Sequence, residues 1–300
     1  MLRQWFINKG VFQWFFWGSV FALLTQIAFT VNATPLQPIQ VKQGDIFVMA
    51  IQLEEGISFV QGRFLGNAIS FYKNSNDLFE ALVGVDLAAP LGTYSLEIEW
   101  DQKGVKGTTH LGKRDYVIEV KSGGFGTQTL TLPKKMVDLD QETLDRVHRE
   151  SERFKELFRL RVEQKLWEGA FVIPAEGPRM GSFGVSRIMN GEARNPHTGE
   201  DIGAPLGAPV RATQSGTVVL VGDFYFNGRS VVIAHGLGLF SMYFHLKDIF
   251  VKEGQSVKWG EKVATVGQSG RATGPHLHWG VRLNDARVNP FSLMEFKALF

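Results

Sequence analysis

Residues 34–135 carry the hydrophobic pattern of short β-strands. Apolar positions gather in six segments that recur at intervals of roughly 10–15 residues, with Gly, Asn and Asp turns between them. These segments are DIFVMAIQL, ISFVQG, AISFYKN, FEALVGVDL, TYSLEIEW and RDYVIEV. The spacing predicts an antiparallel sandwich or barrel, because a fold of alternating strands and helices would place helical periodicity between the strands. His110 stands alone here and is interpreted as a surface or structural residue, so no candidate chemistry is assigned to this domain.

A helical pattern replaces the strand pattern within residues 136–168. Apolar or small residues fall at spacings of three and four, with charged residues between them, at Leu144, Val147, Ser151, Phe154 and Phe158. This periodicity predicts an amphipathic helix that links two domains and packs on one of them. Asp138, followed three residues later by Gln141, is the predicted N-cap. His148 lies beside the apolar stripe and is interpreted as a helix-surface residue.

From residue 169 to residue 300 the pattern returns to strands with Gly-rich turns. The strand-like segments are GTVVLVGDFYF, SVVIAHG, LFSMYFHL, KVATVGQSG and HLHWGVRL. The fold class predicted for the whole chain is therefore mostly β, with an N-terminal sandwich-like domain, a linking helix and a C-terminal β domain. Several histidines lie in the C-terminal part, so chemistry is expected there.

The N-terminal residues predict export. Arg3 and Lys9 precede residues 11–31, which contain no charged residue, and the small residues Val31 and Ala33 lie at the end of this run. This is the order of a signal peptide cleaved after residue 33. The apolar run also approaches the ~20 residues that span a bilayer, so membrane anchoring through residues 11–31 is the alternative.

Composition narrows the chemistry that the chain can perform. The sequence contains no cysteine, which excludes disulfides, thiolate nucleophiles and cysteine-bound zinc. Any metal must therefore be held by His, Asp or Glu. The net charge is +2 and no long basic run is present, so nucleic acid is not an expected partner.

Two histidines lie one residue apart in the segment GPHLHWG. If the segment is a strand, His276 and His278 point to the same face while Leu277 points into the core. Both imidazoles then face one site. The alternative is a surface strand that carries histidines without a function, and this segment alone leaves both interpretations open.

A second pair of candidate ligands lies in RNPHTGEDIGAP, where His197 and Asp201 are four residues apart. Nearby Pro and Gly residues favour a loop running into a strand over a helix. With one histidine of the HxH pair, they supply two imidazoles and a carboxylate, which is the ligand composition of a catalytic zinc site with an open fourth position. The remaining histidine of the pair and His245, in MYFHL, are candidates for proton transfer.

Three longer motifs carry a family resemblance across about residues 170–292. They are SFGVSRIMNGEARNPHTGEDIGAPLGAPVRA, MYFHLKDIFVKEGQSVKWGEKVATVGQSGRATGPHLHWGVRL and VNP. In this order they resemble the LytM-type, lysostaphin-like zinc endopeptidases. The resemblance implies a small antiparallel β peptidase domain with a groove across its sheet. It also implies that His197, Asp201 and His278 bind Zn²⁺, and that His245 and His276 are catalytic groups beside the attacking water and the reacting carbonyl.

The resemblance implies an endopeptidase that uses metal-activated water to hydrolyse peptide bonds in peptidoglycan stems or cross-links, in the periplasm or cell envelope. The alternatives are a non-catalytic wall-binding or amidase-regulating module, and a proenzyme that requires removal of residues 34–168. Retention of all five candidate residues favours the enzyme. His235 resembles a structural histidine of the family. Arg187 and the pair at residues 190–191 match positions near the groove, where a substrate contact and a structural role are both open.

Overall fold

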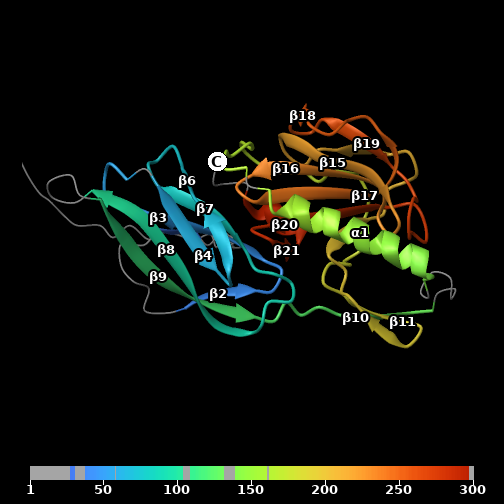
Figure 1. Cartoon of the computed structure of the whole chain (residues 1–300), viewed down its shortest axis with the longest axis horizontal. Coiled ribbons are helices and arrows are strands. Elements are labelled where there is room, and N and C mark those ends of the chain that lie inside the picture. Colours follow the sequence, from blue (N-terminus) through green and yellow to red (C-terminus); the bar gives the residue numbers. More distant parts are fainter. Residues whose placement is uncertain are drawn as a thin grey trace, which may run out of the picture.

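The computed structural model describes residues 28–30, 38–57, 59–103, 109–131, 139–160 and 162–296 (Figure 1). The fold is mostly β with one long helix, which confirms the predicted fold class. The predicted signal peptide or anchor lies outside the described residues, apart from the short strand β1 (Ala28–Thr30). Among the helices of the described part of the chain, none is long and apolar enough to cross a membrane.

The N-terminal domain contains two sheets that face each other. One has the strand order β1-β3-β7-β6, and the other has the order β2-β9-β8-β4-β5. Their bounds are β2 (Ile39–Lys42), β3 (Ile46–Ile51), β4 (Val60–Phe64), β5 (Asn67–Ser70), β6 (Tyr72–Lys73), β7 (Phe79–Gly84), β8 (Gly92–Lys103) and β9 (Thr109–Lys121). Most pairings are antiparallel, as expected, but β1 pairs with β3 and β2 pairs with β9 in parallel.

Strands β3 and β7 are covered on both faces, since all six residues of each are buried. In β3, Phe47 and Met49 belong to the core of the N-terminal sandwich, whereas Ile46 and Val48 belong to the core of the C-terminal domain. Leu82 of β7 also joins the C-terminal core. Successive side chains of a strand point to opposite faces, so this sheet is the shared wall between the two domains.

The C-terminal domain is built on a nine-stranded antiparallel sheet. Its main path is β13-β20-β17-β16-β15-β18, with β14, β19 and β21 paired at its sides. The bounds are β13 (Gly199–Ile202), β14 (Pro209–Arg211), β15 (Gly216–Phe224), β16 (Gly228–Gly236), β17 (Leu239–Ile249), β18 (Ser256–Val257), β19 (Lys262–Val266), β20 (Leu277–Leu283) and β21 (Ala286–Val288). A 3-10 helix, Pro290–Phe296, follows.

The linking helix α1 (Gln141–Phe158) packs on the C-terminal sheet, beside β15 and β17 (Figure 1). It is shorter than the 136–168 segment in which it was predicted. Its N-cap is Asp140, whose carboxylate accepts a hydrogen bond from the Thr143 amide, and not Asp138, which lies outside the described residues. Burial is concentrated at the C-terminal end of the apolar stripe: Phe158 is buried, whereas Leu144 remains 46% exposed.

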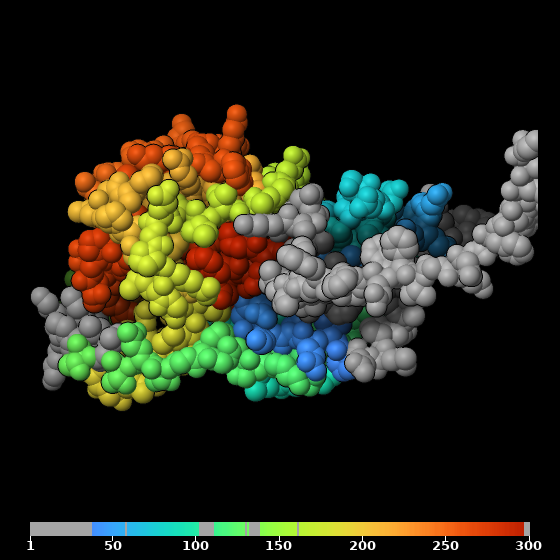
Figure 2. All heavy atoms as spheres, turned by 180° about the vertical axis from the view of Figure 1, so that it is seen from behind, coloured from blue at the N-terminus to red at the C-terminus, as the bar shows by residue number. Residues whose placement is uncertain are grey.

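A short strand extends from the N-terminal domain to the C-terminal one. β10 (Thr127–Leu130) pairs in parallel with β11 (Ser186–Met189), which forms a hairpin with β12 (Glu192–Arg194). Figure 2 shows the green chain that leads to β10 running along one edge of the molecule to the yellow hairpin. Asn190 and Gly191 form its two-residue turn with positive φ angles of 52° and 84°, as expected of an Asn-Gly hairpin turn.

An ion pair fixes the two domains against each other. Asp86 accepts hydrogen bonds from the Arg287 amide, Nε and Nη2 at 2.8, 2.9 and 2.6 Å.

We expect Asp86→Ala to lower the free energy of unfolding by about 2 kcal/mol, because charge-assisted hydrogen bonds are lost and Arg287 is left without its partner. Urea unfolding checks this, with Asp77→Asn as the control, since Asp77 pairs with Lys73 at the exposed surface. Equal midpoints for the two variants would contradict the expectation.

Candidate metal and catalytic site

Strand register places two of the candidate ligands opposite each other. β13 pairs with β20 so that Asp201 is the direct partner of His278. His197 lies in the loop just before β13, as the Pro and Gly residues around it predicted. His276 lies immediately before β20, and Leu277 between the two histidines is fully buried in the core. The HxH segment therefore directs both imidazoles to one side of the sheet.

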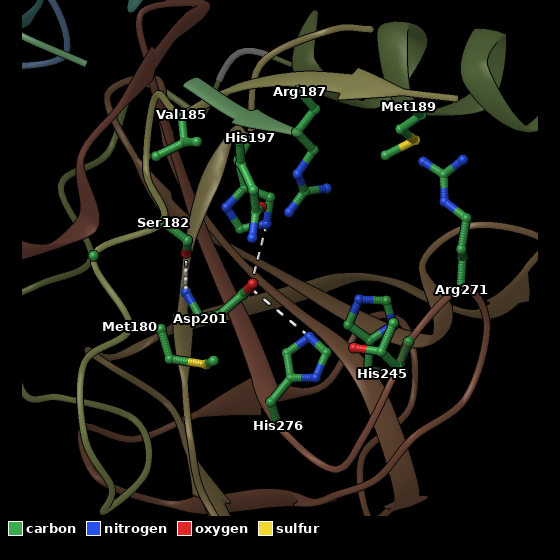
Figure 3. A pocket seen from close by; sticks show the side chains of 14 residues that line it. Met180, Ser182, Val185, Arg187, Met189, His197, Asp201, His245, Arg271 and His276 are labelled. Atoms are coloured by element: carbon green, nitrogen blue, oxygen red, sulfur yellow. Dashed lines mark hydrogen bonds and ion pairs between the residues drawn. The ribbon is translucent and has the colours of Figure 1, made fainter. Parts of the chain in front are cut away.

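Three potential ligand atoms meet at one point. His197 Nε2 lies 2.9 Å from His278 Nδ1, and Asp201 Oδ1 lies 3.3 Å from the first and 3.1 Å from the second. Figure 3 shows His197 and Asp201 of this group. Ligand atoms at the corners of a zinc tetrahedron with bonds of about 2.0 Å are about 3.3 Å apart. The three atoms thus fit one face of such a tetrahedron, and they form the candidate metal-binding group within the described part of the chain.

The protonation states of these groups suit metal binding. Burial lowers the pKa of His278 to about 4, so its imidazole is neutral at pH 7. Burial alone would raise the pKa of the Asp201 carboxyl, but hydrogen bonds and charge from His197 and His278 bring it far below its usual range. A carboxylate and neutral imidazoles are the forms in which these side chains bind metals.

His245 and His276 lie beside the ligands with matching hydrogen bonds. His245 Nδ1 lies 2.8 Å from the Ser269 carbonyl, and His276 Nδ1 lies 2.8 Å from the Gly274 carbonyl. A carbonyl only accepts, so Nδ1 carries the proton in each ring and Nε2 is the basic nitrogen of the neutral form. The ring centroids are 4.8 Å apart, and His276 Nε2 lies 3.8 Å from Asp201 Oδ1. Burial and the neighbouring histidines lower the pKa of His245, which keeps that ring neutral.

Aromatic packing from α1 supports the candidate ligand His278. Its ring stacks on Phe244 of β17 with an interplanar angle of 6° and a centroid distance of 5.3 Å. Phe244 in turn contacts Phe154 of α1, edge to face at 5.9 Å. The helix that links the two domains therefore helps to hold a candidate metal ligand in position.

A buried acidic residue supports the other side of the site. Glu200 is fully buried and accepts hydrogen bonds from the Ser182 amide at 2.7 Å and from Arg179 Nε at 3.2 Å. The Ser182 hydroxyl accepts the amide hydrogen bond of Asp201 at 2.9 Å. This network fixes the backbone of β13, from which the Asp201 carboxylate projects.

Gly199 allows His278 to approach β13. A Cβ at position 199 would lie 2.5 Å from His278 Nε2 and 2.6 Å from the Trp279 carbonyl oxygen.

We expect Gly199→Ala to displace the imidazole and weaken metal binding by about 10–100-fold, the effect typical of losing an interaction that orients a ligand. Competition with a fluorescent zinc chelator measures this. Gly126→Ala, where a Cβ meets no atom within 4 Å, is the control, and equal zinc affinities would disprove the steric role.

The site opens into a cavity of about 410 Å³ (Figure 3). Besides candidate residues, it is lined by Gln128 of β10, Arg187 and Met189 of β11, and Arg271 of the loop before β20. Gln128 and Arg271 were not singled out in the sequence. Gln128 comes from the predicted accessory domain, and its place in the cavity depends on a strand pairing that no local pattern reveals.

His148 and His235 do not line this cavity. His235 is fully buried, with Nδ1 2.8 Å from the Ser215 carbonyl and Nε2 2.8 Å from the Ser241 hydroxyl. Its environment agrees with the structural interpretation. His148 is exposed on α1.

The fold and the His-Asp-His group together describe a β-sheet domain with a candidate metal site. Residues 195–290, within the C-terminal domain, match the profile of Peptidase family M23. This confirms the resemblance to LytM-type and lysostaphin-like peptidases. The match includes His197, Asp201, His245, His276 and His278.

Curated relatives match about a third of the chain. Peptidoglycan DD-endopeptidase ShyB of Vibrio cholerae is 44% identical over 94 residues, which are 31% of this chain and 22% of that protein. DD-carboxypeptidase/endopeptidase Mpg of Neisseria meningitidis is 43% identical over 97 residues, 32% of this chain and 22% of that protein. The chain thus spans about a fifth of the length of these relatives.

A solved structure matches both domains. A Pseudomonas aeruginosa protein provisionally assigned to peptidase M23 is 29% identical, with a TM-score of 0.65. The alignment covers 86% of this chain and 96% of that one, so the N-terminal sandwich and its attachment to the C-terminal domain are included.

Proposed function

We propose that this chain is a zinc-dependent endopeptidase that hydrolyses peptide bonds in peptidoglycan stems or cross-links. The observation that carries the proposal is the convergence of His197 Nε2, His278 Nδ1 and Asp201 Oδ1 on one point beside the cavity. Two imidazoles and one carboxylate leave a fourth position open, as catalytic zinc sites do. The match of residues 195–290 to Peptidase family M23 supports the same assignment.

Zinc held by these three residues would polarise the scissile carbonyl and lower the pKa of the attacking water towards ~7. His245 and His276 supply the proton transfers. Their Nε2 atoms are the basic nitrogens, because Nδ1 of each donates to a backbone carbonyl. One accepts the proton of the water, and either can then donate a proton to the leaving amine or a hydrogen bond to the developing oxyanion.

The substrate assignment draws on the relatives. Proteins that are 44% and 43% identical over the matched region are named for endopeptidase activity, one of them on peptidoglycan. We further propose that the chain is exported to the periplasm or cell envelope, where peptidoglycan lies. The charged N-terminal residues followed by the uncharged segment 11–31 support this, as a cleaved signal peptide or as an anchor.

Chromatography of muropeptides tests the proposed function. Purified cross-linked dimers are incubated with the full chain, with and without a chelator. The full chain is used because Ile46 and Leu82 of the N-terminal domain belong to the core of the C-terminal domain, and their removal would expose the residues packed against them. We expect chelator-sensitive conversion of dimers to monomers. Binding of the dimers without any product would instead support the non-catalytic wall-binding module.

A further inference from the structure

Two arginines project into the cavity beside the candidate metal ligands. Arg187 comes from β11, and Arg271 comes from the loop between β19 and β20. Figure 3 shows both guanidinium groups on the side of the view opposite Met180 and Ser182. The two arginines also line an adjoining cavity of about 310 Å³ that reaches α1. Both arginines therefore line the wall that the two cavities share.

Neither guanidinium has an ion-pair partner within 4 Å among the described residues. The Nε atom of Arg187 is buried and has no hydrogen-bond partner in that part of the chain. Asp201 attracts Arg187, but it belongs to the candidate metal group. Other enclosed arginines differ, because Arg282 pairs with Asp285 at 2.6 Å and Arg287 pairs with Asp86 at 2.6 Å.

The electrostatic setting of the pair favours an added anion. Burial lowers the pKa of Arg187, and the pKa of Arg271 is lowered by burial and then by the charge of Arg187. Removing a charge from water without a partner is costly, and two like charges add to that cost. The guanidinium of Arg271 also lies 4.2 Å from the ring centroid of Phe226, a contact that orients its plane.

We propose that Arg187 and Arg271 together bind a free carboxylate on a residue adjoining the scissile bond of the substrate. The inference rests on the proposed function. Guanidinium groups bind carboxylates through paired, charge-assisted hydrogen bonds, for which both side chains have free donors. In a cross-link between D-amino acids, the residue that supplies the amine keeps a carboxylate on the carbon bearing that amine. A glycine bridge offers no such group at an internal bond, so the arginine pair selects between these substrate classes.

A pair of matched substrates tests the selection. One is a cross-linked muropeptide dimer, and the other is the same dimer with the carboxylate adjoining the cross-link converted to a carboxamide. We expect the full-length wild type to cleave the carboxylate form with kcat/KM about 10–100-fold higher, as charge-assisted hydrogen bonds allow. In Arg187→Gln and Arg271→Gln this ratio falls towards one, and Arg→Lys at either position restores part of it.

Arg282→Gln is the control, because Arg282 is also enclosed and lies 4.5 Å from the ring centroid of Phe158, but outside the cavity. It should keep the wild-type ratio. Equal kcat/KM values for both substrates with the wild type would overturn the proposal. A uniform loss of rate on both substrates in the Arg→Gln variants, with the ratio retained, would show a structural role and overturn it as well.

A binding measurement separates failure of this proposal from failure of the proposed function. If the wild type cleaves neither dimer, the proposed function fails, and the Kd values of both dimers are then compared by isothermal titration calorimetry. At least tenfold tighter binding of the carboxylate form, lost in Arg271→Gln, would still support carboxylate recognition. Equal Kd values would refute it.

Discussion

Replacing His278 with alanine is expected to abolish both zinc binding and hydrolysis. Its Nδ1 atom is one of the three that converge on the candidate metal position, and the variant would leave only His197 and Asp201. Two protein ligands do not make the three-ligand site of a catalytic zinc. Metal content by mass spectrometry of the purified chain and the release of monomers from muropeptide dimers measure the two losses.

His148→Ala is the control for this variant, since His148 is exposed on α1 and does not line the cavity. It should retain the metal and the activity of the wild type. Hydrolysis at the wild-type rate by the His278→Ala variant would show that the reaction does not depend on this group.

His276→Ala is expected to separate metal binding from catalysis. His276 Nε2 lies 3.8 Å from Asp201 Oδ1, beside the ligand group but outside it, so most of the zinc should be retained. Loss of a proton-transfer group typically costs about 10²–10⁴ in rate. Single-turnover hydrolysis by zinc-saturated protein measures the change in rate, and metal analysis of the same sample checks occupancy.

His245→Ala provides the comparison within the site. Like His276, His245 donates an Nδ1 hydrogen bond to a backbone carbonyl and lines the cavity. The variant with the larger loss identifies the group that carries most of the proton transfer. Wild-type rates in both variants would contradict the roles assigned to these imidazoles. A zinc loss in His276→Ala as large as that in His278→Ala would contradict its place outside the ligand group.

Local patterns in the sequence predicted much of the fold and the HxH geometry. The two-residue period of a strand indicated that His276 and His278 face one site and that Leu277 enters the core, although the segment alone left a surface strand open as the alternative. The Pro and Gly residues around His197 correctly excluded a helix there. These predictions succeeded because each depends on residues that are close together in the chain.

Features that depend on distant pairing could not be derived from local patterns, and the family resemblance alone implied that Asp201 and His278 share a site. Asp201 meets His278 through the register of β13 and β20, and Gln128 reaches the cavity through the parallel pairing of β10 with β11. Local period does not determine which strands become neighbours. Arg271 lies in a Gly-rich loop, where its charge was visible but its lack of an ion-pair partner among the described residues was not.

The burial of helix α1 also could not be predicted fully from local periodicity. Its periodicity predicted an apolar stripe, but burial is concentrated around Phe158, and the exposed Leu144 instead lines the cavity next to Arg187. The stripe predicts which face is apolar, whereas the surface that covers it depends on the position of the helix over the sheet.

Zinc titration of metal-free protein is the measurement that tests the central claim most directly. Full-length chain is stripped of metal, and hydrolysis of muropeptide dimers is followed as zinc is added. The account predicts no hydrolysis without metal, a linear rise to one zinc per chain and no further gain beyond that point. Unchanged hydrolysis by the metal-free protein would contradict it.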